Sequence, residues 1–336
     1  MGLPVILSAV LSLLLASSTT ATPHPSSVYS GSEYKLVVTR KFFPDSSIKY
    51  TSQHDIVNLL VPLNKINFDD DDDSDEEGSN NVTFFFTEAD IENNGDRQYK
   101  GLSVYHNGKA TKVLENGRDA TAFNDDSKKV YIGATNGIYI YEDGATKKYG
   151  ALSDSIIQIE ADNQTGTVYF LTEDHQLFSV GDEGDAKNKV EDVKDVKEFV
   201  VDYNSNIFYY DSNEHLHVFN QDGVKKFEDL PKDSTVKLVR PMFSQDEGAS
   251  AVIGKKVYVI NPNATLSPTP VTMEVAPTAY APDATLLQYY ALDKKIYEYN
   301  VMDLFVSNFK DLKDYLNDKK DEINKIATKS RSAFGA

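Results

Sequence analysis

The sequence predicts an all-β fold, a six-bladed β-propeller, because apolar or aromatic positions recur six times at nearly constant spacing. Strand-like units that repeat about every 40 residues are typical of this architecture. A second column of mostly aromatic positions lies two residues upstream of the first. The first column is Tyr105, Tyr141, Val180, Phe219, Ile260 and Tyr299, with gaps of 36, 39, 39, 41 and 39 residues, and the second is Ser103, Tyr139, Phe178, His217, Tyr258 and Tyr297.

The N-terminal segment indicates an exported protein. Residues 3–16 form an apolar run that is too short for a membrane span, and small or hydroxylated residues follow it up to Ala21. This pattern predicts a secretory signal peptide over residues 1–21 and therefore an extracellular protein. Residues 22–33 are rich in Ser, Thr, Pro and His, and they are predicted to form a flexible leader.

Residues 34–301 are predicted to form the propeller, and the second repeat shows the blade pattern best. Asn136-Gly137 and Asp143-Gly144 separate apolar runs, and such dipeptides are strong signals for β-hairpin turns. Each blade should therefore contain four strands, A to D, counted outward from the channel. In the second repeat these strands are expected at 120–123, 130–133, 138–141 and 146–149.

The two ends of the repeat region predict how the ring closes. The sixth repeat stops after its third strand, so we expect the lone strand at 34–43 to supply the missing outer strand and protect the open edge. A five-bladed ring with spare ends is the alternative. Residues 302–336 are predicted to be an amphipathic α-helix and tail that pack against the propeller. The apolar residues of that helix are Phe305, Phe309, Leu312, Leu316, Ile323 and Ile326.

Composition excludes several classes of partner. The 336 residues carry a net charge of −18, which repels nucleic acid and anionic membranes, so neither is an expected partner. The chain has no cysteine, so its stability must come from core burial and not from disulfides. An acidic insertion over residues 68–80 lacks the spacing of an EF-hand loop and is expected to be solvated and disordered.

Three glycosylation sequons indicate which face of the disc is open. Asn81 and Asn163 fall in predicted A–B loops, and Asn263 falls in a predicted C–D loop. In a propeller these two kinds of loop emerge on the same face. The acidic insertion and the C-terminal helix are expected on that face too, so a ligand should use the opposite one.

Polar residues on that opposite face are the candidate site. Cationic groups there could pair with an anionic ligand, and abundant aromatic side chains could stack on a planar ring. The candidates for ligand binding are His54, Arg118, Ser153, Lys197 and Arg240.

Two sets of residues could form a metal site, and each set also has a simpler structural interpretation. Aspartates that precede several of the predicted strands A could converge on a divalent ion such as Ca²⁺, although Asp in this position also serves turns. His215 and His217 lie two apart on a predicted strand, but the sequence identifies no third ligand, so ordinary blade positions are favoured. The aspartates of the first alternative are Asp55, Asp119, Asp154 and Asp233.

Parts of the repeats resemble a known family. The segments at 130–139, 206–210 and 217–219 are similar to blades of the insect ommochrome-binding proteins. That family comprises secreted haemolymph proteins of moths that carry tryptophan-derived phenoxazinone pigments. The resemblance implies a secreted carrier of a small aromatic ligand, with no catalysis and no cofactor. This chain departs from the family in having no cysteine, and no binding residues carry over.

Three functions follow from these observations. The favoured one is a secreted carrier of an aromatic pigment or metabolite in the propeller channel. The first alternative is a metal-dependent lactonase or esterase of the gluconolactonase type, which needs the aspartates to converge. The second alternative is a protein-interaction scaffold that uses the disc or the terminal helix, with an unknown protein partner.

Overall fold

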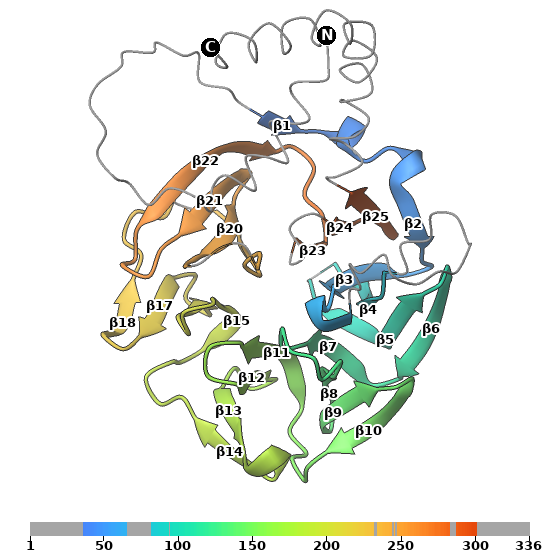
Figure 1. The fold of residues 1–336 in the computed structure, drawn as a ribbon. Coiled ribbons are helices and arrows are strands. Elements are labelled where there is room, and N and C mark those ends of the chain that lie inside the picture. The colour runs from blue at the N-terminus through green and yellow to red at the C-terminus, as the bar shows by residue number, and fades with distance from the viewer. Residues whose placement is uncertain are drawn as a thin grey trace, which may run out of the picture.

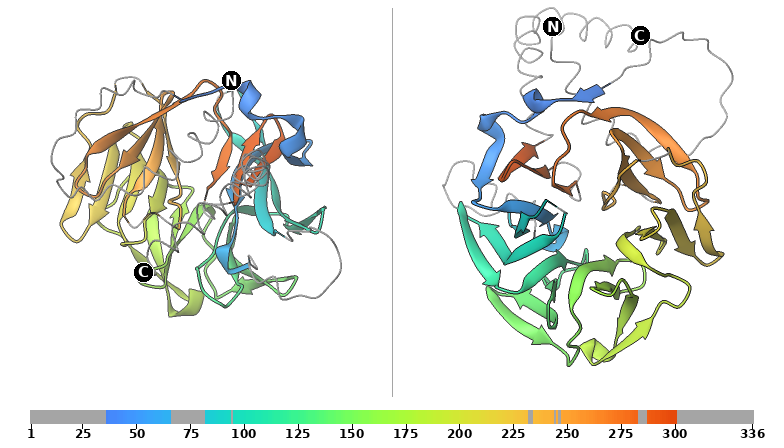
Figure 2. Two further views of the ribbon diagram at one scale, coloured as in Figure 1. Left: turned by 45° about the horizontal axis from the view of Figure 1, so that its top comes forward. Right: turned by 180° about the vertical axis from the view of Figure 1, so that it is seen from behind.

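Six β-sheets surround a central channel, so the protein is a six-bladed β-propeller (Figure 1). The computed structural model describes residues 36–300, apart from 66–81, 94, 232–233, 244, 246 and 283–286. The same radial arrangement is visible from behind in Figure 2. The segments predicted to be a signal peptide, a flexible leader, a disordered acidic insertion and a C-terminal helix lie outside the described residues, as does Asn81. No helix in the described ranges is long and apolar enough to cross a membrane.

In each of the first four blades, the four strands follow one another in the chain from the channel outward. Blade 1 is β3 (Asp55–Leu60), β4 (Phe84–Ile91), β5 (Arg97–His106) and β6 (Lys109–Leu114). Blade 2 is β7 (Gly117–Thr121), β8 (Val130–Ala134), β9 (Gly137–Glu142) and β10 (Ala145–Tyr149). Blade 3 is β11 (Ile156–Asp162), β12 (Thr167–Thr172), β13 (Leu177–Gly181) and β14 (Ala186–Lys189). Blade 4 is β15 (Val196–Val201), β16 (Ile207–Asp211), β17 (Leu216–Asn220) and β18 (Gly223–Lys226).

The last two blades include N-terminal strands. Blade 5 is β19 (Val236–Val239), β20 (Ala249–Ile253), β21 (Lys256–Ile260), β22 (Leu266–Met273) and β1 (Leu36–Val38). Blade 6 is β23 (Ala279–Ala281), β24 (Leu287–Leu292), β25 (Lys295–Asn300) and β2 (Ile48–Thr51). Four short 3₁₀ helices complete the elements of the described part: η1 (Arg40–Phe42), η2 (Asp45–Ser47), η3 (Leu63–Lys65) and η4 (Asp182–Gly184).

The hydrophobic core lies between neighbouring blades. Each blade alternates its side chains between two faces, so each face packs on a different neighbour. Phe84 and Phe86 of blade 1 pack on Tyr289 of blade 6, whereas Phe85 of blade 1 packs toward Ile132 of blade 2. The remaining clusters join blades 2 and 3, 3 and 4, 4 and 5, and 5 and 6. Buried apolar contacts therefore run around the whole ring.

The N-terminal segment differs from its prediction. Residues 34–43 were expected to pair with the third strand of blade 6, but β1 pairs in parallel with β22 of blade 5. Residues 48–51, which form β2, pair with β25 of blade 6 instead. The chain turns between the two strands through η1 and η2, where Pro44 has no N–H to donate to a ladder. Phe42 stacks on Tyr299 with ring centroids 4.9 Å apart, which anchors this turn.

The predicted strands of the second repeat agree with blade 2 except at its first strand. β8, β9 and β10 begin and end within one residue of their expected bounds. β7 begins at Gly117, three residues earlier than expected, and its pairing with β8 contains a register shift between Gly117 and Asp119.

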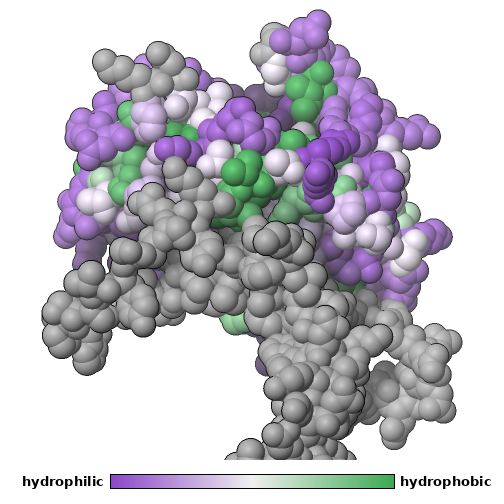
Figure 3. Space-filling view, turned by 90° about the horizontal axis from the view of Figure 1, so that it is seen from above, coloured by the Kyte–Doolittle hydropathy of each residue, from purple (hydrophilic) through white to green (hydrophobic). Residues whose placement is uncertain are grey.

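The described surface at one edge of the disc is mostly hydrophilic. Figure 3 shows the edge of the disc near β1 and β22, where hydrophilic residues cover most of the described surface. Among the described residues, large apolar side chains are exposed at Val37, Ile91, Val224 and Phe243. This surface agrees with the acidic composition of the chain. The channel is therefore the candidate location of a ligand-binding site.

Candidate functional site

A cavity of about 380 Å³ occupies the central channel. Residues from the inner strands of all six blades line it, together with side chains at the start of β5 and the end of β16. Because inner strands expose one face to the channel, residues far apart in sequence meet there. The charged side chains that line the cavity are Arg97, Asp119, Glu160, Lys197, Glu198, Lys237 and Arg240.

Arg240 crosses the channel and holds three other blades. Its Nε donates to both carboxylate oxygens of Glu160 in blade 3, at 2.9 Å each. Its Nη2 donates to the two oxygens of Asp119 in blade 2 at 3.3 and 3.2 Å, and its Nη1 donates to the Leu59 carbonyl of blade 1 at 3.2 Å. Arg240 itself follows β19 of blade 5. We call Arg240, Glu160 and Asp119 the channel clamp.

The channel clamp is buried. The side chains of Asp119 and Glu160 are only 3% and 6% exposed, and that of Arg240 is 13% exposed. Burial raises the pKa of both carboxyl groups, and the positive charge of Arg240 opposes this rise. Two carboxylates share one guanidinium, so each also disfavours the ionised form of the other. The clamp is therefore a site where a proton is held more tightly than on ordinary carboxyl groups.

The clamp lies between two cavities. Glu160 and Arg240 line the 380 Å³ cavity and also a smaller cavity of about 50 Å³ toward Leu60, Thr121 and Asn163. Arg240 was expected to pair with an anionic ligand, but protein groups engage its guanidinium. Its position favours a structural role across the channel.

The other candidate binding residues lie in different places. Lys197 lines the main cavity, with its ammonium 6.0 Å from the centre of the Tyr210 ring. Arg118 donates to the Ser155 hydroxyl at 3.1 Å and lies 5.1 Å over the ring of Tyr99. Arg118 is not among the residues that line the cavity.

His54 and Ser153 also lie outside the cavity lining. Nδ1 of His54 contacts the Asp90 carboxylate at 2.7 Å, and Ser153 is exposed before β11. The structure therefore brings only Lys197 and Arg240 of the five candidates to one cavity.

The four aspartates of the metal alternative have separate surroundings. Asp119 belongs to the clamp, Asp154 forms an ion pair with Lys187, and Asp55 begins β3. Asp233 lies outside the described residues. Within the described ranges, none of them belongs to a group of three or more side chains that could share a metal ion.

Both described sequon asparagines are exposed. Asn163 follows β11 in an A–B connection, and Asn263 lies between β21 and β22 in a C–D connection. The fold thus places both on the same face, as the loop scheme predicts. Their glycosylation remains a prediction.

Sequence reasoning missed the partners of Arg240. Glu160, Asp119 and Leu59 are 80, 121 and 181 residues away from it along the chain. No local pattern could indicate these pairs, although each carboxylate lies on an inner strand. It also missed Arg97, Tyr99 and Tyr280, which line the cavity from two neighbouring blades.

The clamp predicts how stability depends on pH. Because the pKa of Glu160 is higher in the folded protein, the folded state binds more protons than the unfolded chain above about pH 4.3. The free energy of unfolding should therefore fall as pH rises from there through the raised pKa. We expect Glu160→Gln to weaken this fall, measured by urea unfolding across that range. Glu191→Gln, at an exposed carboxylate, is the control, and equal slopes in both variants would contradict the prediction.

Comparisons with known proteins assign no function to the chain. No family model and no curated protein matches the chain. A Bacteroides thetaiotaomicron protein of unknown function is 13% identical, with a TM-score of 0.49 over 74% of this chain and 69% of that one. Virginiamycin B lyase from Staphylococcus aureus is 14% identical, with a TM-score of 0.49 over 75% of this chain and 87% of that one. A gluconolactonase-like protein is 10% identical, with a TM-score of 0.44 over 76% and 92%. No residue role is transferred from them.

Proposed function

We propose that the protein is a secreted carrier that binds a small aromatic anion in the main channel cavity. A volume of about 380 Å³ falls in the range of about 300–1,000 Å³ typical of small-molecule sites. The carrier class also agrees with the resemblance to ommochrome-binding proteins, whose pigments are planar and derived from tryptophan. Export and glycosylation at Asn81, Asn163 and Asn263 belong to the same proposal.

The charge of the cavity is the observation that carries this proposal. Four cationic and three acidic side chains line it, in a chain whose net charge is −18. Lys237 forms an ion pair with Glu198, and Arg240 is held in the clamp. Arg97 and Lys197 are exposed to the cavity, and neither has a carboxylate partner in the described part of the chain. Two cations in a strongly acidic protein favour an anionic ligand there.

Aromatic side chains supply the apolar half of the cavity. Tyr99, Tyr210 and Tyr280 line it from blades 1, 4 and 6. Burial raises the pKa of Tyr280, so its hydroxyl stays neutral and can donate a hydrogen bond. Tyrosine rings can stack on a planar ligand while lysine and arginine bind its carboxylate.

The remaining predictions about the ends of the chain belong with this proposal. We infer that the N-terminal strand pairing closes the ring and keeps the channel rigid. The C-terminal helix over 302–336 would then cover the face that carries the sequons. No arrangement of the described residues specifically favours the lactonase alternative, because Asp119 and Asp154 are engaged by Arg240 and Lys187.

Ligand titration tests the proposal. With xanthommatin as the probe in isothermal calorimetry, Lys197→Met and Arg97→Met should each weaken binding by about 10–100-fold. That range corresponds to about 1.5–3 kcal/mol for a lost hydrogen bond to a charged group. Lys189→Met, an exposed lysine on β14, should bind like the parent protein. If the parent does not bind xanthommatin or kynurenine-pathway acids, or if all three variants bind equally well, the proposal is wrong.

A further inference from the structure

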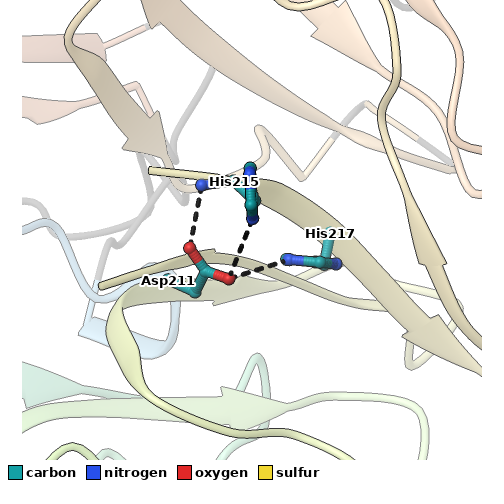
Figure 4. A group of neighbouring side chains, drawn as sticks. All are labelled: Asp211, His215 and His217. Carbon is teal, nitrogen blue, oxygen red and sulfur yellow. Dashed lines mark hydrogen bonds and ion pairs between the residues drawn. The ribbon is translucent and has the colours of Figure 1, made fainter. Parts of the chain in front are cut away.

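A cluster of three side chains lies in blade 4, outside the main cavity lining (Figure 4). Asp211 ends β16, and His215 and His217 come from the turn and β17 that follow. Oδ2 of Asp211 is 3.1 Å from Nε2 of His217 and 3.6 Å from Nδ1 of His215. One potential ligand atom from each residue lies within 4.8 Å of the others. A carboxylate and two imidazoles thus face one point.

The carboxylate is already oriented before any ion binds. Oδ1 of Asp211 accepts hydrogen bonds from the backbone N–H of Asn213 at 2.9 Å and of His215 at 2.8 Å. These bonds fix the carboxylate plane and leave Oδ2 directed at the two rings (Figure 4). The His217 ring is also fixed, because it stacks on Tyr209 at 4.8 Å with an interplanar angle of 14°. Preorganised ligands of this kind favour ion binding.

Blade 3 contains the same turn without the cluster. In blade 3 the backbone N–H of Thr172 donates to the Gln176 carbonyl at 3.0 Å. In blade 4 the backbone N–H of Asp211 donates to the His215 carbonyl at 2.9 Å in the same way. His175 and Glu214, the residues before these carbonyls, have similar positive φ values of 63° and 65°.

The side chains at matching positions of the two turns show what the fold requires. Phe178 takes the place of His217 and stacks on Phe170 at 5.5 Å and 20°, as His217 does on Tyr209. Gln176 takes the place of His215, and the Thr172 hydroxyl replaces the carboxylate in accepting the backbone N–H at 3.3 Å. The turn and its packing therefore need neither histidine.

We propose that Asp211, His215 and His217 bind a divalent transition metal of the zinc class, with one coordination position left open. Two imidazoles and one carboxylate are a ligand set that zinc takes in sites where water or a substrate completes a tetrahedron. Calcium and magnesium prefer all-oxygen ligands, so this site selects against them. The site lies apart from the proposed carrier cavity, so either proposal can fail alone.

The surroundings of the cluster set the strength of binding. Lys226 pairs with His217 across the strands, and its charge opposes a cation there. Nδ1 of His217 is buried without a hydrogen-bond partner among the described residues, whereas strong zinc sites give this nitrogen an acceptor. We therefore expect affinity below that of a structural zinc site.

Cobalt binding tests the proposal in the full chain. With excess Ca²⁺ present to occupy carboxylate-only sites, Co²⁺ should bind with one-to-one stoichiometry, give visible d–d absorption, and be displaced by Zn²⁺. His215→Gln, at a half-exposed position, should weaken cobalt binding by more than about 100-fold, since even changing a residue that only hydrogen-bonds to a metal ligand costs about 10–100-fold. His217→Phe, the residue found in blade 3, should do the same.

Two further variants control this experiment. His106→Gln removes an exposed histidine at the end of β5 and should leave cobalt binding unchanged. Asp211→Asn keeps a side-chain oxygen that can accept the hydrogen bonds of the turn, and it removes the negative charge of the ligand. Loss of cobalt binding in this variant would therefore reflect the missing ligand and not misfolding. Circular dichroism checks the fold of each variant. Absence of bound cobalt in the parent, or equal binding in the parent and in His215→Gln, would overturn the proposal.

Discussion

Replacing Arg240 with Met should lower the free energy of unfolding by about 3–5 kcal/mol, because the change leaves two buried carboxylates without their cation. Asp119 and Glu160 are 3% and 6% exposed, so water cannot take over the role of the guanidinium. The same change also removes the bond to the Leu59 carbonyl at 3.2 Å. Urea unfolding at pH 7 measures the loss.

The pH dependence of this variant identifies the cause. Without Arg240, the pKa of each carboxyl should rise further, so the folded variant would take up protons that the unfolded chain does not hold. Its deficit relative to the parent should therefore shrink as pH falls toward 5 and grow as pH rises. A deficit that does not change with pH would show that lost packing, and not stranded charge, explains the effect.

Two companion variants make the result specific. Arg97→Met removes an exposed arginine from the same cavity and should change stability by less than about 0.5 kcal/mol. Adding Asp119→Asn and Glu160→Gln to the Arg240 variant should recover much of the loss, because neutral amides cost less to bury than unpaired charges. An equal loss in the Arg97 and Arg240 variants would contradict the clamp.

Gly137→Ala should destabilise the protein by about 2–6 kcal/mol. Gly137 begins β9 with φ at 117°, a conformation that costs a side chain about 1–3 kcal/mol. A Cβ there would lie 2.0 Å from the Leu152 carbonyl oxygen, in the segment between blades 2 and 3. That segment cannot move aside freely, because the Leu152 N–H bonds to the Gly184 carbonyl at 3.2 Å. Forcing such a contact adds about 1–3 kcal/mol.

Gly144→Ala is the matched control for this prediction. Gly144 lies in the next turn of the same blade with φ at 81°, and a Cβ there meets nothing within 4 Å. It should cost only the conformational term, about 1–2 kcal/mol. Thermal and urea unfolding of the two variants compare them directly. Similar losses in both would show that the contact with Leu152 relaxes at no cost.

The blades themselves could be predicted from the sequence to within a residue or two at many boundaries. Alternation of apolar residues and the Asn136-Gly137 and Asp143-Gly144 turns act over a few residues, so they are visible in the chain. The six-fold repeat then implied a ring. The N-terminal pairing could not be predicted in this way, because Leu36–Val38 and Ile48–Thr51 are both short strand-like segments that could serve as an edge strand.

The candidate site was predictable only in part. Lys197 was expected on the open face of the disc, and the structure has it lining the channel cavity from the start of an inner strand. The sequence indicated the His215 and His217 pair but not its third ligand, since the turn that brings Asp211 to the rings depends on backbone bonds within 211–215. Arg240 was expected at a ligand, and the structure gives it two carboxylates instead.

The repeat, the strands and their turns are therefore determined by short stretches of the sequence itself. The clamp of Arg240, Glu160 and Asp119 exists only after the blades close into a ring, since its members are 80 and 121 residues apart and meet by tertiary packing. The same holds for the cavity, to which all six inner strands contribute. Short-range patterns predict strands because the two strands of a hairpin are neighbours in sequence. The charged residues of the channel are far apart in sequence, and only the folded ring brings them into contact.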